Sequence, residues 1–186
     1  MIGYFVFFGF ILNALCNSDS WIYVDVNKGA PAPSVPFPNA QFKIKFSSEQ
    51  TCDIFTAVEI EVLHGEPGNH VHTFEDEFFN IIEGEVQFIV NGTQFCARQG
   101  DYVYVPKNVS QTFRVHNPNF TKKRAKIQIV MFKAGGEGFF REMATFYLQG
   151  SNNDTIVDEI AKKYGFAFLE PVVWDDLGCF SDDRRS

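Results

Sequence analysis

A series of short segments in which apolar and polar residues alternate constrains the fold of this chain more than any other feature. The segment TAVEIEVLHG places Val58, Ile60 and Val62 on one face of a strand, with Glu59 and Glu61 on the other. Similar segments follow as far as AKIQIVMF, and Gly, Pro or Asn separates them. Short strands at this spacing predict an all-β domain, either a barrel or a sandwich.

The most definite pair of strands surrounds Asn91-Gly92, a dipeptide that two-residue type I′ turns favour because both positions take positive φ. EVQFIV precedes this turn and TQFCA follows it, so the chain from 85 to 97 is predicted to form a hairpin. Further strands are predicted in FKIKF, YVYVP, QTFRVH and AKIQIVMF.

The first residues have the features of a targeting segment. IGYFVFFGFIL has the length of a signal-peptide apolar region and is too short to span a bilayer. Ala14 and Cys16 are small residues at a cleavage position, although no Lys or Arg precedes the apolar run. The mature chain is therefore predicted to begin near Asn17 and to be secreted, and the alternative is a buried N-terminal strand.

Four Asn-x-Ser/Thr acceptor triplets agree with a secretory route and predict a glycoprotein. They begin at Asn91, Asn108, Asn119 and Asn153. Cleavage after Cys16 would leave Cys52, Cys96 and Cys179, of which two can pair in an oxidising compartment while one is left over. The sequence does not choose among the three pairings.

The remaining segments complete the predicted organisation. Four of the eight prolines lie in residues 27–40, which predicts an extended arm rather than a packed element. GEGFFREMATFYLQ and NNDTIVDEIAKKYG show helical spacing, and the second ends at Gly165. The predicted parts are a signal peptide over 1–16, an N-terminal arm and first strand over 17–50, a barrel over 51–135, a C-terminal helical segment over 136–170 and a tail over 171–186.

The charge distribution restricts the classes of partner. The formal net charge is -7, and no basic run exceeds Lys122-Lys123-Arg124. Binding to nucleic acid or to an anionic membrane is therefore not expected. A small molecule is the expected ligand, and a homodimer through the barrel sheet is one assembly that the fold allows.

Two of the four histidines stand in the triplet His70-Val71-His72, and Glu77 follows. Residues two apart on a strand point the same way, so both imidazoles face one side. Two histidines and one carboxylate around one point suit Fe(II) and tolerate Mn, Ni, Cu or Zn. On the residues alone, the alternative is a polar strand end with histidines beside acidic groups by chance.

GEPGNHVHTFEDEFFNIIEG resembles the first signature of the cupin superfamily, in which a Glu follows His-x-His and a Gly follows after six intervening residues, here Glu77 and Gly84. GDYVYVPKNVSQTFRVHN resembles the second signature, and EGFFREM and IAKKYGFAFLEP are similar to the tails of small quercetin-dioxygenase-like cupins. The resemblance covers residues 55 to 135. It implies a cupin (double-stranded β-helix, or jelly-roll) barrel with a Pro-rich N-terminal arm and C-terminal helices. It also implies a divalent-metal site with Glu77 as ligand, base or both.

The second signature departs from the family pattern at Gln111, where members with four protein ligands place a histidine. Gln111 can ligate through its amide oxygen or hydrogen-bond a metal-bound water. His116 lies five residues further along, an odd number, and is predicted to point to the opposite face. His64 is predicted to be a core histidine near the barrel mouth.

If Glu77 faces the metal, strand alternation carries Phe79 and Ile81 into the barrel, and Phe113 likewise follows Gln111 inward. They would then form an apolar wall for an aromatic or other hydrophobic ligand. The alternative is that they only fill the barrel, as interior side chains of small barrels usually do.

Three functions stay open on this basis. The first is a metal-dependent dioxygenase acting on an aromatic or enolisable small molecule, as the quercetin-dioxygenase-like resemblance implies. The second is a secreted cupin that binds a ligand or a metal without turnover. The third is a sugar-type isomerase or lyase, which the apolar interior favours least.

Overall fold

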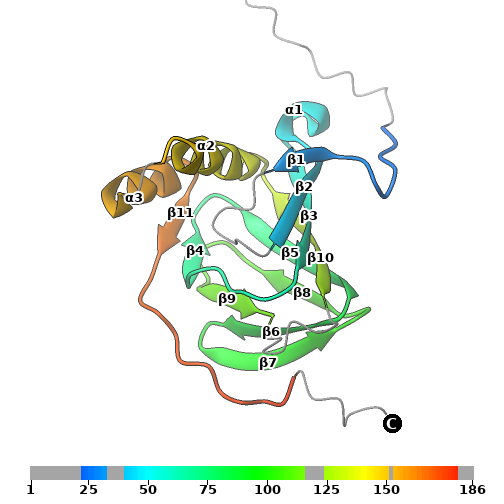
Figure 1. Ribbon diagram of the computed structural model, residues 1–186, viewed down its shortest axis with the longest axis vertical. Coiled ribbons are helices and arrows are strands. Elements are labelled where there is room, and N and C mark those ends of the chain that lie inside the picture. Colours follow the sequence, from blue (N-terminus) through cyan, green and yellow to red (C-terminus); the bar gives the residue numbers. More distant parts are fainter. Residues whose placement is uncertain (1–21, 33–39, 116–123, 151–152, 180–186) are drawn as a thin grey trace, which may run out of the picture.

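The computed structural model describes residues 22–32, 40–115, 124–150 and 153–179, and in these ranges the chain folds into two β-sheets that face each other (Figure 1). One sheet has the strand order β1-β2-β3-β10-β5-β8, and the other has the order β11-β4-β9-β6-β7. The first sheet consists of β1 (Ala30–Ala32), β2 (Ala40–Phe46), β3 (Phe55–Val62), β5 (Asp76–Glu83), β8 (Tyr102–Val105) and β10 (Ala125–Phe132). The second consists of β4 (His70–His72), β6 (Glu85–Val90), β7 (Thr93–Arg98), β9 (Gln111–Arg114) and β11 (Phe166–Phe168).

Apolar residues from both sheets fill the space between them. Val58, Ile60 and Val62 of β3 are at most 2% exposed and belong to this core, as predicted, whereas Glu59, predicted on the other face, is also buried, at 8%. β10 lies at the centre of its sheet and pairs along its length with β3 and β5, so its Ile127 and Ile129 reach the middle of the core. The predicted all-β barrel is therefore confirmed.

The hairpin of β6 and β7 also forms as predicted. Val90 pairs with Thr93, and the two turn residues between them, Asn91 and Gly92, take φ values of +48° and +77°. Positive φ at both positions is the type I′ geometry, whose twist matches that of the flanking strands.

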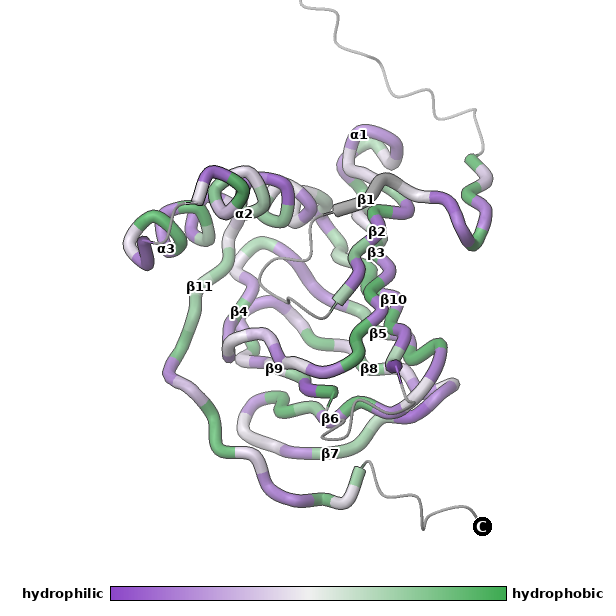
Figure 2. The backbone as a smooth tube through the Cα atoms, in the orientation of Figure 1, coloured by the Kyte–Doolittle hydropathy of each residue, from purple (hydrophilic) through white to green (hydrophobic). Residues whose placement is uncertain are grey.

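Helices cover one end of the barrel (Figure 1). α2 (Glu137–Leu148) and α3 (Asp154–Lys163) alternate hydrophobic and hydrophilic residues (Figure 2), whereas α1 (Ser48–Thr51) is a single turn. Phe139, Met143 and Phe146 recur at the spacing of one helical face and pack with Ile160 and Phe166 in a second, smaller core. The two predicted helices are confirmed.

The chain after α3 differs from the prediction. The helical segment was expected to continue to residue 170, but it ends at Lys163, and β11 then pairs with β4. Residues 169–179, here called the C-terminal strap, run along the outside of the second sheet as far as β7 (Figure 1). A disulfide joins Cys179 to Cys96 of β7, so the expectation of a tail over 171–186 is wrong for residues 171–179.

The N-terminal part needs a similar correction. Residues 30–32 of the Pro-rich arm form β1, which pairs antiparallel with β2. Cys52 is also disulfide-bonded, so the prediction of one leftover thiol is wrong. The predicted signal peptide over 1–16, His116 and Asn119 lie outside the described residues. Within the described ranges, no helix combines the length and apolar character that a membrane span requires.

Candidate metal centre

Strand β4 presents His70 and His72 to the barrel interior, where they are 9% and 4% exposed. Each ring has its Nδ1 engaged: that of His70 lies 2.7 Å from the Gly68 carbonyl oxygen, and that of His72 lies 3.2 Å from Glu75 Oε2. In the tautomer in which Nδ1–H donates to these oxygens, each Nε2 keeps a lone pair that can bind a metal ion. The two Nε2 atoms lie 3.2 Å apart.

Glu77 completes the cluster from β5. Its Oε2 lies 3.2 Å from Nε2 of His72, and one ligand atom of each residue lies within 4.8 Å of the others. With metal–ligand bonds of about 2.1 Å, neighbouring donors 3.2 Å apart subtend roughly 100° at the ion. That angle fits three donors on one face of a divalent ion, with further positions open. The structure thus brings together the three residues that the first signature predicted.

Glu75 is a functional residue that the sequence did not assign. Its side chain is buried, with Oε2 facing His72 and Oε1 accepting a 2.6 Å hydrogen bond from the Gly136 backbone N–H. A buried carboxylate that holds the second ring nitrogen of a metal-binding histidine fixes its tautomer and orientation. Glu75 lies between β4 and β5, where strand alternation does not predict its direction.

Gln111 reaches the same place from β9, where it pairs with His70 of β4. It is 2% exposed, and its amide Nε2 donates a hydrogen bond to Oε2 of Glu77. The inward direction predicted for this residue is confirmed. The amide nitrogen, rather than the oxygen, faces the cluster in this arrangement.

Burial and mutual proximity perturb the titration of the cluster. Burial, aided by the neighbouring His72, lowers the pKa of His70 to about 4, so His70 is neutral near pH 7. Burial also opposes the charged form of His72, but Glu77 and Glu75 outweigh it and raise the pKa of His72. Burial raises the pKa of Glu77, although His72 and the Gln111 hydrogen bond oppose the shift.

A small apolar cavity of about 50 Å³ adjoins the cluster. Phe79 and Phe113 line it as predicted, whereas Ile81 is buried in the core without lining it. The other rings come from the C-terminal elements, which the sequence did not connect with the site. The lining residues are Phe42, Ile60, Pro67, His70, His72, Glu77, Phe79, Phe113, Ile129, Phe139, Phe140, Phe166 and Phe168. His64, half-buried in the bend after β3, belongs to neither the cluster nor this lining.

Comparison with known proteins agrees with this geometry. Residues 56–124 match the family model of the EutQ-like cupin domain. The barrel has the cupin fold. No curated protein sequence matches the chain.

Several solved structures share this cupin fold at low sequence identity. An RmlC-like cupin from Shewanella frigidimarina is 16% identical, with a TM-score of 0.50, covering 62% of this chain and 93% of its own. A predicted oxalate decarboxylase from Thermotoga maritima is 18% identical, with a TM-score of 0.52 and coverage of 60% and 99%. The nucleoside dehydratase Pac13 from Streptomyces is 9% identical, with a TM-score of 0.51 and coverage of 83% and 95%. Such identities show the fold alone.

Proposed function

We propose that this cupin domain holds a divalent metal ion on His70, His72 and Glu77, and that it is a dioxygenase acting on a small enolisable or aromatic molecule. The observation that carries the proposal is the spacing of the donors: Nε2 of His72 lies 3.2 Å both from Nε2 of His70 and from Oε2 of Glu77. When bound, such an ion supplies Lewis acidity and open coordination positions. Two histidines and a carboxylate favour iron, ahead of Mn, Ni, Cu or Zn.

The surrounding residues keep the donors in place. Glu75 holds His72 through Nδ1, and Gln111 holds the Glu77 carboxylate through its amide N–H. We assign Gln111 this positioning role, because ligation through its oxygen would require the amide to be reversed. Glu77 would also accept the proton that an enolisable substrate loses, through the carboxylate oxygen that does not bind the ion.

The apolar side chains that line the cavity would support this function by limiting the access of water to the metal site. Phe79 and Phe113 are 1% and 5% exposed and border the cavity beside Glu77. A lining of this kind favours an apolar substrate over a sugar, because sugar hydroxyls would lose water without finding hydrogen-bond partners. The sugar-type isomerase or lyase is therefore the least supported function.

Metal analysis combined with an oxygen electrode tests the proposal. Full-length protein from its native source should contain about one equivalent of redox-active metal. It should consume oxygen when small enolisable or aromatic compounds are supplied. His72→Ala should lose both the metal and the oxygen uptake, while Gln128→Ala, on the outer face of β10, should keep both.

A second function, binding of a ligand or metal without turnover, has one observation in its favour. Gln111 occupies the position of the fourth histidine and supplies no charge or imidazole. Stoichiometric metal without oxygen uptake would select this function. Protein that retains no metal under any loading condition would contradict the dioxygenase and leave binding of an organic ligand as the remaining function.

A further inference from the structure

We propose that the aromatic roof over the metal cluster is held in place, so that the site admits only ligands of a few heavy atoms and excludes molecules of flavonol size. The roof consists of Phe139 and Phe140 of α2 and Phe166 and Phe168 of β11, all of which line the cavity. This inference rests on the proposed metal site and adds the size and polarity of its ligand.

The size limit follows from how tightly the roof packs. The ring of Phe166 is centred 4.3 Å from that of His72 and 4.5 Å from that of Phe139, on which it stacks. The cavity left beneath is about 50 Å³. That volume takes roughly four water-sized groups, whereas sites that enclose drug-sized ligands measure roughly 300–1,000 Å³.

The first anchor of the roof is the start of α2. The Gly136 N–H donates to Oε1 of Glu75, the carboxylate that also holds His72. Glu137 accepts hydrogen bonds from the Ser48 backbone at 2.7 Å and hydroxyl at 2.5 Å, and from the Thr56 hydroxyl at 2.5 Å. Lifting α2 would separate Glu137 from its three donors and Glu75 from one of its two, which makes such a movement costly.

The second anchor is β11, which pairs directly with the strand that carries the metal-binding histidines. Phe166 lies opposite His72, and Phe168 lies opposite His70. Just before β11, the carbonyl oxygen of Gly165 accepts hydrogen bonds from the Thr73 backbone at 2.7 Å and hydroxyl at 3.0 Å. The roof and the metal strand are therefore parts of one hydrogen-bonded sheet.

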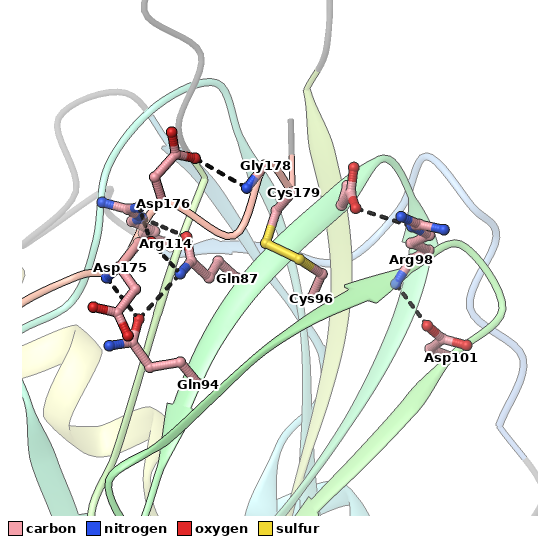
Figure 3. The surroundings of a disulfide bond; sticks show 11 residues. Gln87, Gln94, Cys96, Arg98, Asp101, Arg114, Asp175, Asp176, Gly178 and Cys179 are labelled. Carbon is pink, nitrogen blue, oxygen red and sulfur yellow. Dashed lines mark hydrogen bonds and ion pairs between the residues drawn. A yellow bond between two sulfur atoms is a disulfide. The ribbon is translucent and has the colours of Figure 1, made fainter. Parts of the chain in front are cut away.

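The C-terminal strap adds the third anchor (Figure 3). Its Asp175 carbonyl oxygen accepts hydrogen bonds from Gln87 and Arg114, at 3.0 Å and 3.2 Å. Beyond it, the Cys96–Cys179 disulfide ties the strap covalently to β7. Because the strap continues directly from β11, this bond restricts how far β11 can move away from β4.

The polarity of the lining further restricts the class of ligand that the cavity can bind. None of the described residues that line the cavity is Lys or Arg, and its polar side chains are those of the metal cluster itself. A second carboxylate on the ligand would be buried without a partner. The site therefore fits a small molecule whose oxygen atoms face the metal cluster and whose remainder is apolar.

Calorimetric titration of the Co(II)-loaded, full-length protein tests this inference with two probes that both present two oxygens to a metal. Acetohydroxamate has five heavy atoms, and 3-hydroxyflavone has three linked or fused rings. Wild-type protein should bind acetohydroxamate and give no detectable heat with 3-hydroxyflavone. Phe166→Ala, and the less buried Phe168→Ala, should bind 3-hydroxyflavone at least tenfold more tightly than wild type.

Two further variants test whether a gain of 3-hydroxyflavone binding comes from loss of the roof or from general loosening of the fold. Phe146→Ala removes a ring of α2 that does not line the cavity and should behave like wild type. Replacing Cys96 and Cys179 with Ser should admit 3-hydroxyflavone while leaving acetohydroxamate binding unchanged. A gain of binding cannot come from a variant that merely unfolds.

The outcomes distinguish this inference from the proposed function. If wild-type protein binds 3-hydroxyflavone with the same affinity as Phe166→Ala does, the roof does not limit ligand size. That result would leave the proposed metal site intact. The same holds if Co(II) binds and none of the roof or disulfide variants gains affinity for 3-hydroxyflavone. Absence of Co(II) binding would overturn the metal site and the inference with it.

Discussion

At the scale of single residues, the cluster consists of donors that are each fixed by a neighbour. His70 is held by the Gly68 carbonyl group, His72 by Glu75, and Glu77 by Gln111. Burial makes these neighbours necessary, because a buried imidazole or carboxylate without a partner destabilises the fold. The residues that position the donors should therefore affect metal affinity almost as strongly as the donors do.

We expect Glu75→Gln to weaken metal binding by about 10- to 100-fold, the usual effect of losing a group that orients a metal-binding histidine. Glu75 accepts two hydrogen bonds, from His72 and from Gly136. In the Gln variant one carboxylate oxygen is replaced by an NH₂ group, which cannot accept a hydrogen bond, so one of these two donors loses its acceptor. Calorimetric titration with Mn(II) or Ni(II) measures the change. Glu66→Gln, in the exposed loop before β4, is the matched control, and equal affinities for the two variants would exclude the role of Glu75.

We expect Gln111→His to tighten metal binding at least about tenfold, or ~1.4 kcal/mol. Gln111 already points at Glu77 from β9, so an imidazole there becomes a fourth donor that a borderline metal ion prefers to an amide. Anaerobic titration of Fe(II), Mn(II) or Ni(II) compares the two proteins, with Gln128→His on the outer face of β10 as control. If Gln111→His gives no gain, position 111 does not reach the metal.

At the scale of elements, α2 and β11 close the end of the barrel at which the metal cluster lies. α2 is amphipathic and packs Phe139, Met143 and Phe146 inward. Amphipathicity alone does not determine where a helix docks. Glu137 provides that placement, because it joins the first turn of α2 to Ser48 of α1 and Thr56 of β3.

The ionisation of Glu137 should make stability depend on pH. Burial opposes its charged form, but hydrogen bonds from Ser48 and Thr56 outweigh burial and hold the pKa of Glu137 below its usual 4.5. A lowered folded-state pKa stabilises the protein above the unfolded-state pKa, and this contribution is lost as the pH falls through the folded-state value. We expect Glu137→Gln to cost about 1.5–3 kcal/mol at pH 7, the usual contribution of hydrogen bonds to a charged group.

Urea unfolding of wild type and Glu137→Gln at pH 7 and at pH 3 measures this difference. The gap between the two proteins should narrow at pH 3, because the unfolded wild-type chain is then protonated at Glu137 and part of the stabilisation by the ionised carboxylate is lost. The control variant Glu159→Gln, at an exposed position, should have the same free energy of unfolding as wild type at both pH values. A gap that is the same at pH 7 and pH 3 would contradict an ionised Glu137.

At the scale of the whole molecule, the secretory route stays a prediction, and the disulfide and the acceptor triplets provide ways to test it. The Cys96–Cys179 disulfide closes a loop across 83 residues of sequence and joins the strap to the barrel. Disulfides of this kind persist in oxidising compartments. Three of the four glycosylation triplets, those at Asn91, Asn108 and Asn153, place an exposed asparagine at the surface.

We expect Asn91 to carry a glycan in protein secreted from eukaryotic cells. It lies exposed at the tip of the hairpin, whereas Asn108 lies next to the metal strand, with its N–H bonded to the His72 carbonyl group at 2.7 Å. Asn108 should therefore be modified less completely. Peptide mapping after enzymatic deglycosylation measures both sites, with Asn91→Gln as control. An unmodified Asn91 in secreted material would contradict the predicted route.

The sequence by itself determined the strands of the barrel, the hairpin and the three members of the metal cluster. Each of these follows from short-range regularities: side chains alternate along a strand, Asn-Gly favours one turn, and His-x-His places two rings on one face. For the same reason, Phe79 could be assigned to the interior from the direction of Glu77, and Phe113 from that of Gln111.

Only the tertiary structure decided how the site is supported and closed. Glu75 meets Gly136 across 61 residues of sequence, and Gln111 meets Glu77 across 34. Residues 166–168 lie within the predicted C-terminal segment, beyond the helix predicted to end at Gly165, and the structure pairs them with β4 as β11. Contacts between distant segments depend on how the whole chain packs, and no local pattern encodes them. The roof over the metal cluster, and the ligand size that it sets, could therefore be inferred only from the folded molecule.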